Sequence, residues 1–116
     1  MTAIQILHNP RCSKSRQTLA LLEEKGIEPE IIKYLDTPPS ETELKVILTK
    51  LNMSARDLLR KGEEAYKTLN LKDTNLNDDD LIKAMVKQPK LIERPIVINQ
   101  DKAKLGRPPE SVLDIL

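Results

Sequence analysis

The stretch AIQILHNPRCSKSRQTLALLEEKGIEPEIIKYL, residues 3–35, decides the fold. It holds a short β-favouring run at 3–7 and a second one at 30–35. Between them a helical pattern starts at Ser13 and ends near Gly26, a residue type common just after helices. Because strand, helix and strand follow one another, the stretch predicts a βαβ unit with parallel strands and a right-handed crossover.

Further helices are predicted after this unit, at residues 37–51, 55–61, 63–71 and 77–87. Ser40 with Glu43, and Ser54 with Asp57, have the spacing of a helix capping box. Asn77 is the expected cap of the last of these helices. Three aspartates follow it, and we interpret them as complementing the helix dipole rather than as a metal site.

The segment RPIVINQDKAKLGR, residues 94–107, predicts two strands joined by a tight turn near Gln100-Asp101. Residues 108–116 predict a last helix that begins at two prolines. The complete order is typical of an α/β, thioredoxin-like fold: β-α-β, a helical insertion, a β-hairpin and a C-terminal helix around a four-stranded mixed sheet. We expect one domain over 1–116, with the insertion at about 38–88.

Composition excludes several classes of function. Nineteen basic and eighteen acidic residues give a net charge of +1, and aromatic residues make up only 2%. A nucleic-acid-binding surface would need a basic face and stacking aromatics, so we expect no nucleic-acid partner. The sequence contains neither a long apolar run nor a signal peptide, so we expect no membrane association. The single cysteine fits a reducing compartment, and we expect the cytoplasm.

Cys12 lies where the first strand has ended and the first helix begins. A thiol of ordinary pKa is only about 3% ionised at pH 7, and a pKa lower by about two units gives roughly 25-fold more thiolate. Unpaired N–H groups and the dipole of a helix N-terminus favour such a thiolate and also attract an anion. Arg11 and Lys14 add positive charge. Cys12 is therefore the candidate nucleophile, and the alternative is a cysteine without a role.

Two neighbours of Cys12 are further candidates. Ser15 completes a C-x-x-S pattern, and we expect its hydroxyl to donate a hydrogen bond to the sulfur. His8, the only histidine, is open to two interpretations. It either pairs with a backbone carbonyl at the strand end or tunes the thiol.

Arginines supply candidate partners for a substrate anion. Arg94 begins the third strand and Arg107 follows the fourth, so an antiparallel hairpin would place them side by side. Planar guanidinium groups suit tetrahedral oxyanions. Arg60, expected at the end of the helix before Gly62, could reach in from the insertion. For each arginine alone, the alternative is a solvated surface side chain.

Four stretches, HNPRCSKSR, DLLRKGE, PKLIERPIVI and LGRPPE, resemble the motifs of the glutaredoxin-linked arsenate reductase family. The match covers almost the whole chain, and the family has a thioredoxin-like fold with a helical insertion. The resemblance implies that Cys12 attacks arsenate and forms a covalent adduct, and that His8 and Ser15 help the thiolate to form. It assigns the oxyanion to Arg60, Arg94 and Arg107, and it implies a cis-proline at Pro95.

The resemblance also implies partners. Because the chain has no second cysteine, its reductants would be glutathione, as co-substrate, and glutaredoxin; no bound cofactor or metal is expected, and we expect a monomer. The loop is more basic than in well-studied members of the family. Two alternatives stay open: a general monothiol glutaredoxin-like oxidoreductase, and a non-enzymatic regulator like the relative that binds RNA polymerase. The first leaves Arg60 and Arg107 without a task, and the second lacks a C-x-x-C switch.

Overall fold

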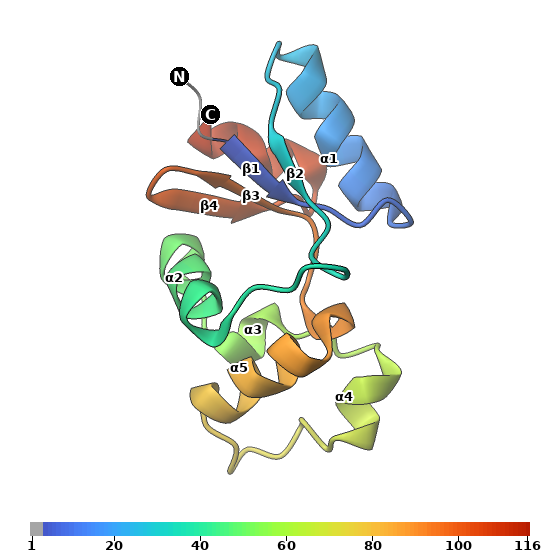
Figure 1. Ribbon diagram of the computed structural model, residues 1–116, viewed down its shortest axis with the longest axis vertical. Coiled ribbons are helices and arrows are strands. Elements are labelled where there is room, and N and C mark those ends of the chain that lie inside the picture. Colours follow the sequence, from blue (N-terminus) through green and yellow to red (C-terminus); the bar gives the residue numbers. More distant parts are fainter. Residues whose placement is uncertain (1–3) are drawn as a thin grey trace. The chain divides into compact units, whose positions relative to one another are not determined.

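The computed structural model describes residues 4–116, and segments from the first and the last third of the chain form a four-stranded mixed sheet (Figure 1). The strand order is β2-β1-β3-β4, with bounds β1 (Ile4–Leu7), β2 (Glu30–Ile32), β3 (Ile96–Asn99) and β4 (Lys102–Leu105). β2 runs parallel to β1, and β3 runs antiparallel to β1 and β4. The predicted parallel pair, hairpin and mixed sheet are confirmed. Ala3, which the predicted first strand includes, lies outside the described residues.

Two helical elements cover one face of this sheet. Helix α1 (Ser13–Glu24) connects β1 to β2, and the 3₁₀ helix η2 (Pro109–Ile115) follows β4 and packs against both β4 and α1. The last predicted helix therefore exists, in the 3₁₀ form. The core between these layers contains Ile4, Ile6, Leu22, Val97 and Val112.

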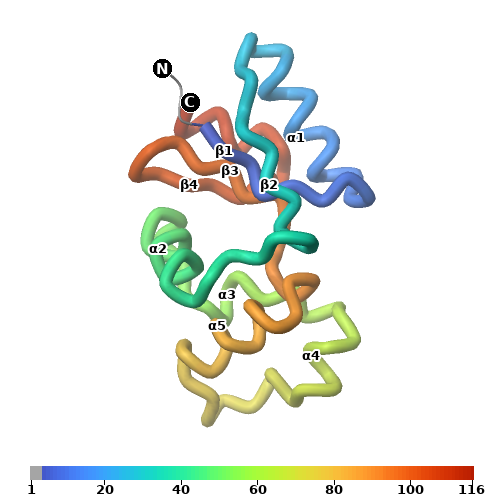
Figure 2. Tube along the Cα trace, viewed as in Figure 1, coloured from blue at the N-terminus to red at the C-terminus, as the bar shows by residue number. Residues whose placement is uncertain are grey.

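The chain forms two compact units. The first unit comprises the residues up to Thr37 together with Arg94–Leu116, and the second unit is Pro38–Glu93. Figure 2 follows the chain out of β2 into the second unit and back to β3. The elements of the second unit are α2 (Glu41–Leu51), α3 (Ala55–Leu58), α4 (Glu64–Thr68), α5 (Asp78–Lys87) and the 3₁₀ helix η1 (Pro89–Leu91). Helices α2 and α3 pack against α5.

Local capping signals begin helices α2 and α5 of the second unit. Ser40 and Glu43 form a complete capping box at the start of α2, as predicted. Asn77 caps α5 in a second box, whose other member is Asp80. Each box satisfies two backbone N–H groups that a helix start leaves without partners.

Several predicted elements are shorter in the structure than expected: the helices predicted at 37–51 and 63–71 span Glu41–Leu51 and Glu64–Thr68, and two further elements end early. The strand predicted at 30–35 stops at Ile32, and the chain then enters a turn in which Tyr34 is fully buried. The helix predicted at 55–61 ends at Leu58. Leu59 is extended and forms an isolated antiparallel bridge with Ile92. The prediction that Arg60 closes a helix is therefore wrong, because tertiary pairing replaces the helical conformation there.

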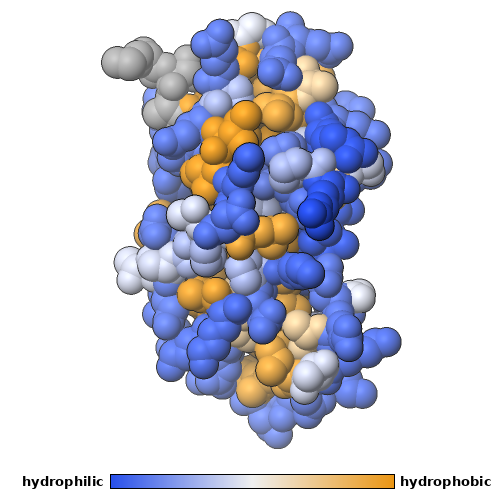
Figure 3. Space-filling model, turned by 45° about the vertical axis from the view of Figure 1, so that its right-hand side comes forward, coloured by the Kyte–Doolittle hydropathy of each residue, from blue (hydrophilic) through white to orange (hydrophobic). Residues whose placement is uncertain are grey.

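Apolar surface is limited in the part of the molecule in view. Figure 3 shows apolar side chains in separate groups among hydrophilic ones. Among residues 4–116, five large apolar residues are more than a third exposed: Ile31, Val46, Leu69, Leu113 and Leu116. Within residues 4–116, each helix is too short or too polar to cross a lipid bilayer.

Candidate active site

Cys12 occupies the N-cap of α1, where the loop from β1 enters the helix. Its backbone is extended, with φ −94° and ψ 123°, as is usual for an N-cap residue. The thiol is free and partly exposed. The sequence predicted this position for the only cysteine of the chain, and the structure confirms the position.

The surroundings of the sulfur lower the pKa of the Cys12 thiol below its ordinary value. Burial alone raises the pKa, because it disfavours the charged thiolate. The backbone N–H of Ser15, the hydrogen bond and positive charge of Arg94, and the backbone N–H of Lys14 together outweigh burial. The thiolate is therefore stabilised mainly by the helix N-terminus and one guanidinium group.

The exposed cations of the loop act less directly than we expected. The charges of Arg11 and Lys14 are not among the causes that lower the thiol pKa, and Lys14 acts through its backbone N–H. Both side chains are exposed, and the Arg16 side chain donates a hydrogen bond to the Pro10 carbonyl. Solvent screens exposed charges, which explains the weak influence of Arg11.

The β3–β4 hairpin brings two arginines together beside Cys12. Arg94 directly precedes this hairpin and Arg107 follows it. The Nε of Arg107 donates a hydrogen bond of 2.8 Å to the Arg94 carbonyl, and the Nη2 of Arg107 lies 3.7 Å from the Cys12 sulfur. The peptide bond from Arg94 to Pro95 is cis, which confirms that expectation, and the bond from Arg107 to Pro108 is also cis. The Arg94 side chain also hydrogen-bonds the Cys12 sulfur, so the two guanidinium groups converge there, as predicted.

Gly106 makes the approach of Arg107 to α1 sterically feasible. A Cβ atom at this position would lie 2.4 Å from Oγ1 of Thr18 and 2.7 Å from Cγ of Pro95. The N–H of Gly106 donates to the Pro95 carbonyl at 3.0 Å, which holds the two ends of the hairpin together. Gly106 was not among the predicted site residues, and its position directly before a candidate arginine is the only sign of its role in the sequence.

The structure corrects the predicted roles of Ser15 and His8. The buried Ser15 hydroxyl lies 2.6 Å from Nδ1 of His8 and accepts a hydrogen bond from the Asn9 N–H at 3.0 Å. It therefore bonds these two groups, and its backbone N–H, rather than its hydroxyl, stabilises the sulfur. His8 pairs with this side chain and not with a backbone carbonyl.

His8 is also not a source of positive charge. Burial lowers the pKa of its imidazole, and the charges of Lys33 and Arg16 lower it further. The ring is therefore neutral at neutral pH.

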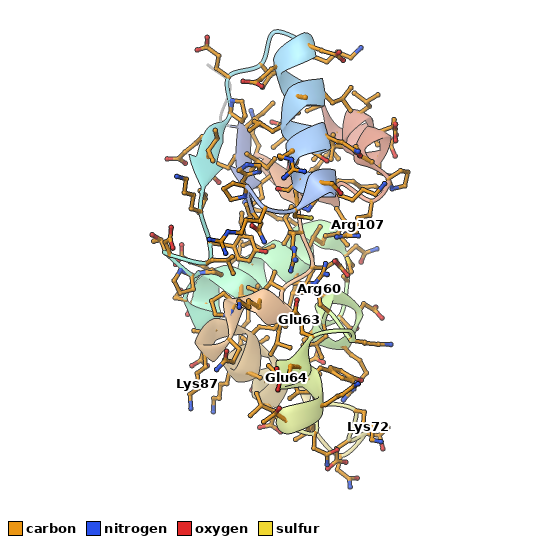
Figure 4. The ribbon with its side chains drawn as sticks, turned by 90° about the vertical axis from the view of Figure 1, so that its right-hand side faces the viewer. Arg60, Glu63, Glu64, Lys72, Lys87 and Arg107 are labelled. Atoms are coloured by element: carbon orange, nitrogen blue, oxygen red, sulfur yellow. The ribbon has the colours of Figure 1, made fainter. Side chains whose placement is uncertain are left out.

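Arg60 lies in the second unit, where two carboxylates hold it. Its Nη1 donates to Glu93 Oε1 at 2.7 Å, and its Nε lies 3.5 Å from Glu63 Oε1. In Figure 4 the labelled side chains of Arg60 and Glu63 lie next to each other. The N–H of Arg60 donates to the Leu91 carbonyl, which extends the pairing begun by Leu59. Neither acidic partner was predicted: Glu93 is brought to Arg60 by tertiary pairing, and Glu63 lies only three residues after it in the sequence.

The structure thus groups the predicted residues in two places. Arg94 and Arg107 lie beside Cys12 in the first unit. His8 and Ser15 belong to the same unit and bond each other, whereas Arg60 belongs to the second unit. In the described part of the chain, side chains that could ligate a metal do not gather in groups of three or more. A half-buried thiolate beside guanidinium groups can bind an oxyanion and attack its central atom.

Comparisons with known proteins agree with this arrangement. The ArsC family model matches residues 7–115. An Escherichia coli K12 protein named uncharacterized protein YfgD is 55% identical over 97% of this chain and 96% of its own length. An arsenate reductase of Haemophilus influenzae is 54% identical over 98% of this chain and 99% of its own length.

A solved structure shares the fold. An arsenate reductase from Vibrio cholerae superposes with a TM-score of 0.97 at 55% identity, covering 99% of this chain and 98% of that one. The expected thioredoxin-like fold is confirmed by this agreement. With a family model spanning both the cysteine loop and the hairpin, and relatives of such identity over nearly the full length, the chain belongs to the ArsC family.

Proposed function

We propose that this protein is an arsenate reductase that reduces arsenate to arsenite through a covalent adduct on Cys12. The observation that carries the proposal is the thiol at the N-cap of α1, with Arg107 at 3.7 Å and Arg94 stabilising its thiolate. The names of the relatives from H. influenzae and V. cholerae support arsenate as the substrate.

In the first step, the Cys12 thiolate attacks the arsenic atom of arsenate. One oxygen leaves as water after protonation, and a sulfur–arsenic(V) bond forms. Arg94 and Arg107 hold the remaining oxygens, because planar donors pair well with tetrahedral oxyanions. Arg60 contributes a third guanidinium by family resemblance, and its two carboxylate partners keep that side chain ordered.

In the second step, the thiolate of glutathione attacks the Cys12 sulfur. The electron pair of the sulfur–arsenic bond stays on arsenic, which is reduced from the +5 to the +3 state and leaves as arsenite. The two sulfur atoms are oxidised to a mixed disulfide. Glutaredoxin then reduces this disulfide and restores the thiol. The single cysteine of the chain supports an external reductant, because no second thiol is present to resolve the adduct.

The proposal uses glutathione as a co-substrate and requires no bound cofactor or metal. A free thiol of this kind works in a reducing compartment, so we place the protein in the cytoplasm. We further propose that it acts as a monomer, because the described nucleophile and both hairpin arginines come from one chain.

The test is arsenate-dependent oxidation of glutathione by the purified protein in the presence of glutaredoxin. Cys12→Ser should abolish turnover. Arg107→Ala should lower it strongly, while Arg11→Ala, which removes an exposed cation without a sulfur contact, should change it little. Turnover that survives Cys12→Ser would overturn the mechanism. Reduction of glutathionylated model substrates without any arsenate reduction would favour the general oxidoreductase instead, and capture of RNA polymerase would favour the regulator.

A further inference from the structure

A tight turn delivers Cys12 from β1 to the start of α1 (Figure 1). The Cys12 N–H donates to the Asn9 carbonyl at 3.0 Å, which closes a four-residue β-turn. Asparagine in the first position and proline in the second are the residues that favour such a turn. The position of the sulfur therefore depends on a turn that begins at Asn9.

The Asn9 side chain adds a second bond to the same turn. Its Oδ1 accepts the Arg11 N–H at 3.0 Å, an Asx-turn that satisfies an amide near the turn centre. Asn9 is only 6% exposed, unlike Pro10 and Arg11, which point to solvent. The bond is part-buried, so water replaces it only incompletely when the Asn9 side chain is removed.

A third bond fastens the turn to α1. The Asn9 N–H donates to the buried Ser15 hydroxyl, which lies one helical turn beyond Cys12. Asn9 thus forms hydrogen bonds with Arg11, Cys12 and Ser15, that is, before, at and after the residue that carries the sulfur. This closed arrangement keeps the sulfur facing the N–H groups of Lys14 and Ser15, the two backbone groups that stabilise its thiolate.

We infer that Asn9 is a positioning residue for Cys12, whose side chain fixes the turn that aims the sulfur at the N-terminus of α1. Asn9 does not contact the substrate in this role and acts only through the geometry of the cysteine loop. The consequence for catalysis rests on the proposed function. The consequence for thiol reactivity does not, because alkylation of Cys12 can be measured without arsenate.

The experiment measures the rate of alkylation by iodoacetamide against pH, together with the melting temperature. Asn9→Ala should raise the midpoint of the alkylation profile, and a rise of about one pH unit leaves roughly tenfold less thiolate below the midpoint. Asn9→Ser should restore much of the reactivity, because a serine hydroxyl can form the equivalent turn. Asn9→Gln should behave like Asn9→Ala, because its longer side chain cannot close the Asx-turn.

The control is Thr18→Val, which removes a part-buried hydrogen bond of 2.8 Å from the buried Thr18 side chain to the Lys14 carbonyl within α1. It should lower the melting temperature and leave the alkylation midpoint unchanged. An Asn9→Ala protein with a lowered melting temperature and a wild-type midpoint would overturn the inference. If that variant does not fold, the comparison of Asn9→Gln with Asn9→Ser decides, and equal midpoints for the two would overturn it. A wild-type protein inactive on arsenate whose midpoint still depends on Asn9 would refute only the proposed function.

Discussion

In the second unit, α2 and α5 each begin at a capping box whose members are three residues apart, whereas in the first unit Cys12 meets Arg107 across 95 positions of sequence. The two units therefore depend on interactions of different range. Short-range patterns mark where α2 and α5 begin. The chemical environment of the thiol depends on a hairpin that comes from the far end of the chain.

Because of this difference, substitutions can change the stability of the second unit and the reactivity of the Cys12 thiol independently. Loss of a cap in the second unit should weaken a helix without changing the thiol, because none of the groups that tune Cys12 belongs to that unit. Changes at the hairpin should affect the thiol directly. The following four predictions test this separation, from the largest expected effect to the smallest.

Arg94→Ala should produce the largest effect, on the thiol. The substitution removes the guanidinium group whose hydrogen bond and positive charge stabilise the Cys12 thiolate, so the thiol pKa should rise. A lost charged hydrogen bond of about 1.5–3 kcal/mol corresponds to roughly a ten- to hundredfold lower rate of arsenate reduction. The matched control is Arg56→Ala, which removes a guanidinium that bonds the Leu71 and Asp73 carbonyls of the second unit. Equal losses of activity in both variants would contradict the idea that the second unit does not influence the reactivity of the thiol.

Gly106→Ala should destabilise the first unit. The added methyl group would overlap Thr18 and Pro95, and overpacking of this kind costs about 1–3 kcal/mol of unfolding free energy. Gly62→Ala in the second unit is the control, because a Cβ there meets nothing within 4 Å. Urea unfolding of both variants provides the comparison. The expectation fails if Gly106→Ala is as stable as Gly62→Ala.

Asn77→Ala should lower the unfolding free energy by about 1 kcal/mol, because α5 loses its N-cap. The alkylation rate of Cys12 should not change. Asn77→Asp retains an acceptor for the Asp80 N–H and should keep most of the stability. Denaturant unfolding and alkylation of the same preparations test both statements, and a slower alkylation of the alanine variant would argue against them.

The smallest effect concerns pH. Burial, Lys33 and Arg16 lower the pKa of His8 in the folded protein, so the unfolded chain takes up a proton at a higher pH than the folded one. The stabilisation is complete above the ordinary histidine pKa of about 6.5 and is lost progressively as pH falls through the lowered value. Unfolding free energies measured from about pH 8 to pH 5.5 should fall toward acid. In His8→Asn, whose amide can replace Nδ1, the unfolding free energy should depend less on pH. His8 is the only histidine, so wild-type and variant curves that run parallel would refute the assignment of this pH dependence to His8.

Much of the architecture could be predicted because its signals are local. The capping boxes and the β-αβ order occupy continuous stretches of sequence. Even the convergence of Arg94 and Arg107 follows from the simple geometry of a hairpin. The helix start at Cys12 was visible for the same reason.

The errors lie where tertiary contacts decide the local structure. Leu59 leaves its helix to pair with Ile92, and the predicted second strand ends early so that Tyr34 can be buried. The Ser15 hydroxyl forms its hydrogen bonds with His8 and Asn9 rather than with the sulfur. This outcome depends on how the end of the strand packs against the helix. No pattern of residue types along the chain distinguishes these outcomes.

The bond between the Arg107 side chain and the Arg94 carbonyl has a kinetic consequence. Arg107 is exposed, yet this anchor leaves its Nη2 3.7 Å from the Cys12 sulfur before any ligand arrives. The Arg107 side chain then loses little rotamer entropy when an anion binds, and it does not have to rearrange before binding. Capture of an anion should therefore be governed by diffusion and ionic strength rather than by the folding of a loop around it.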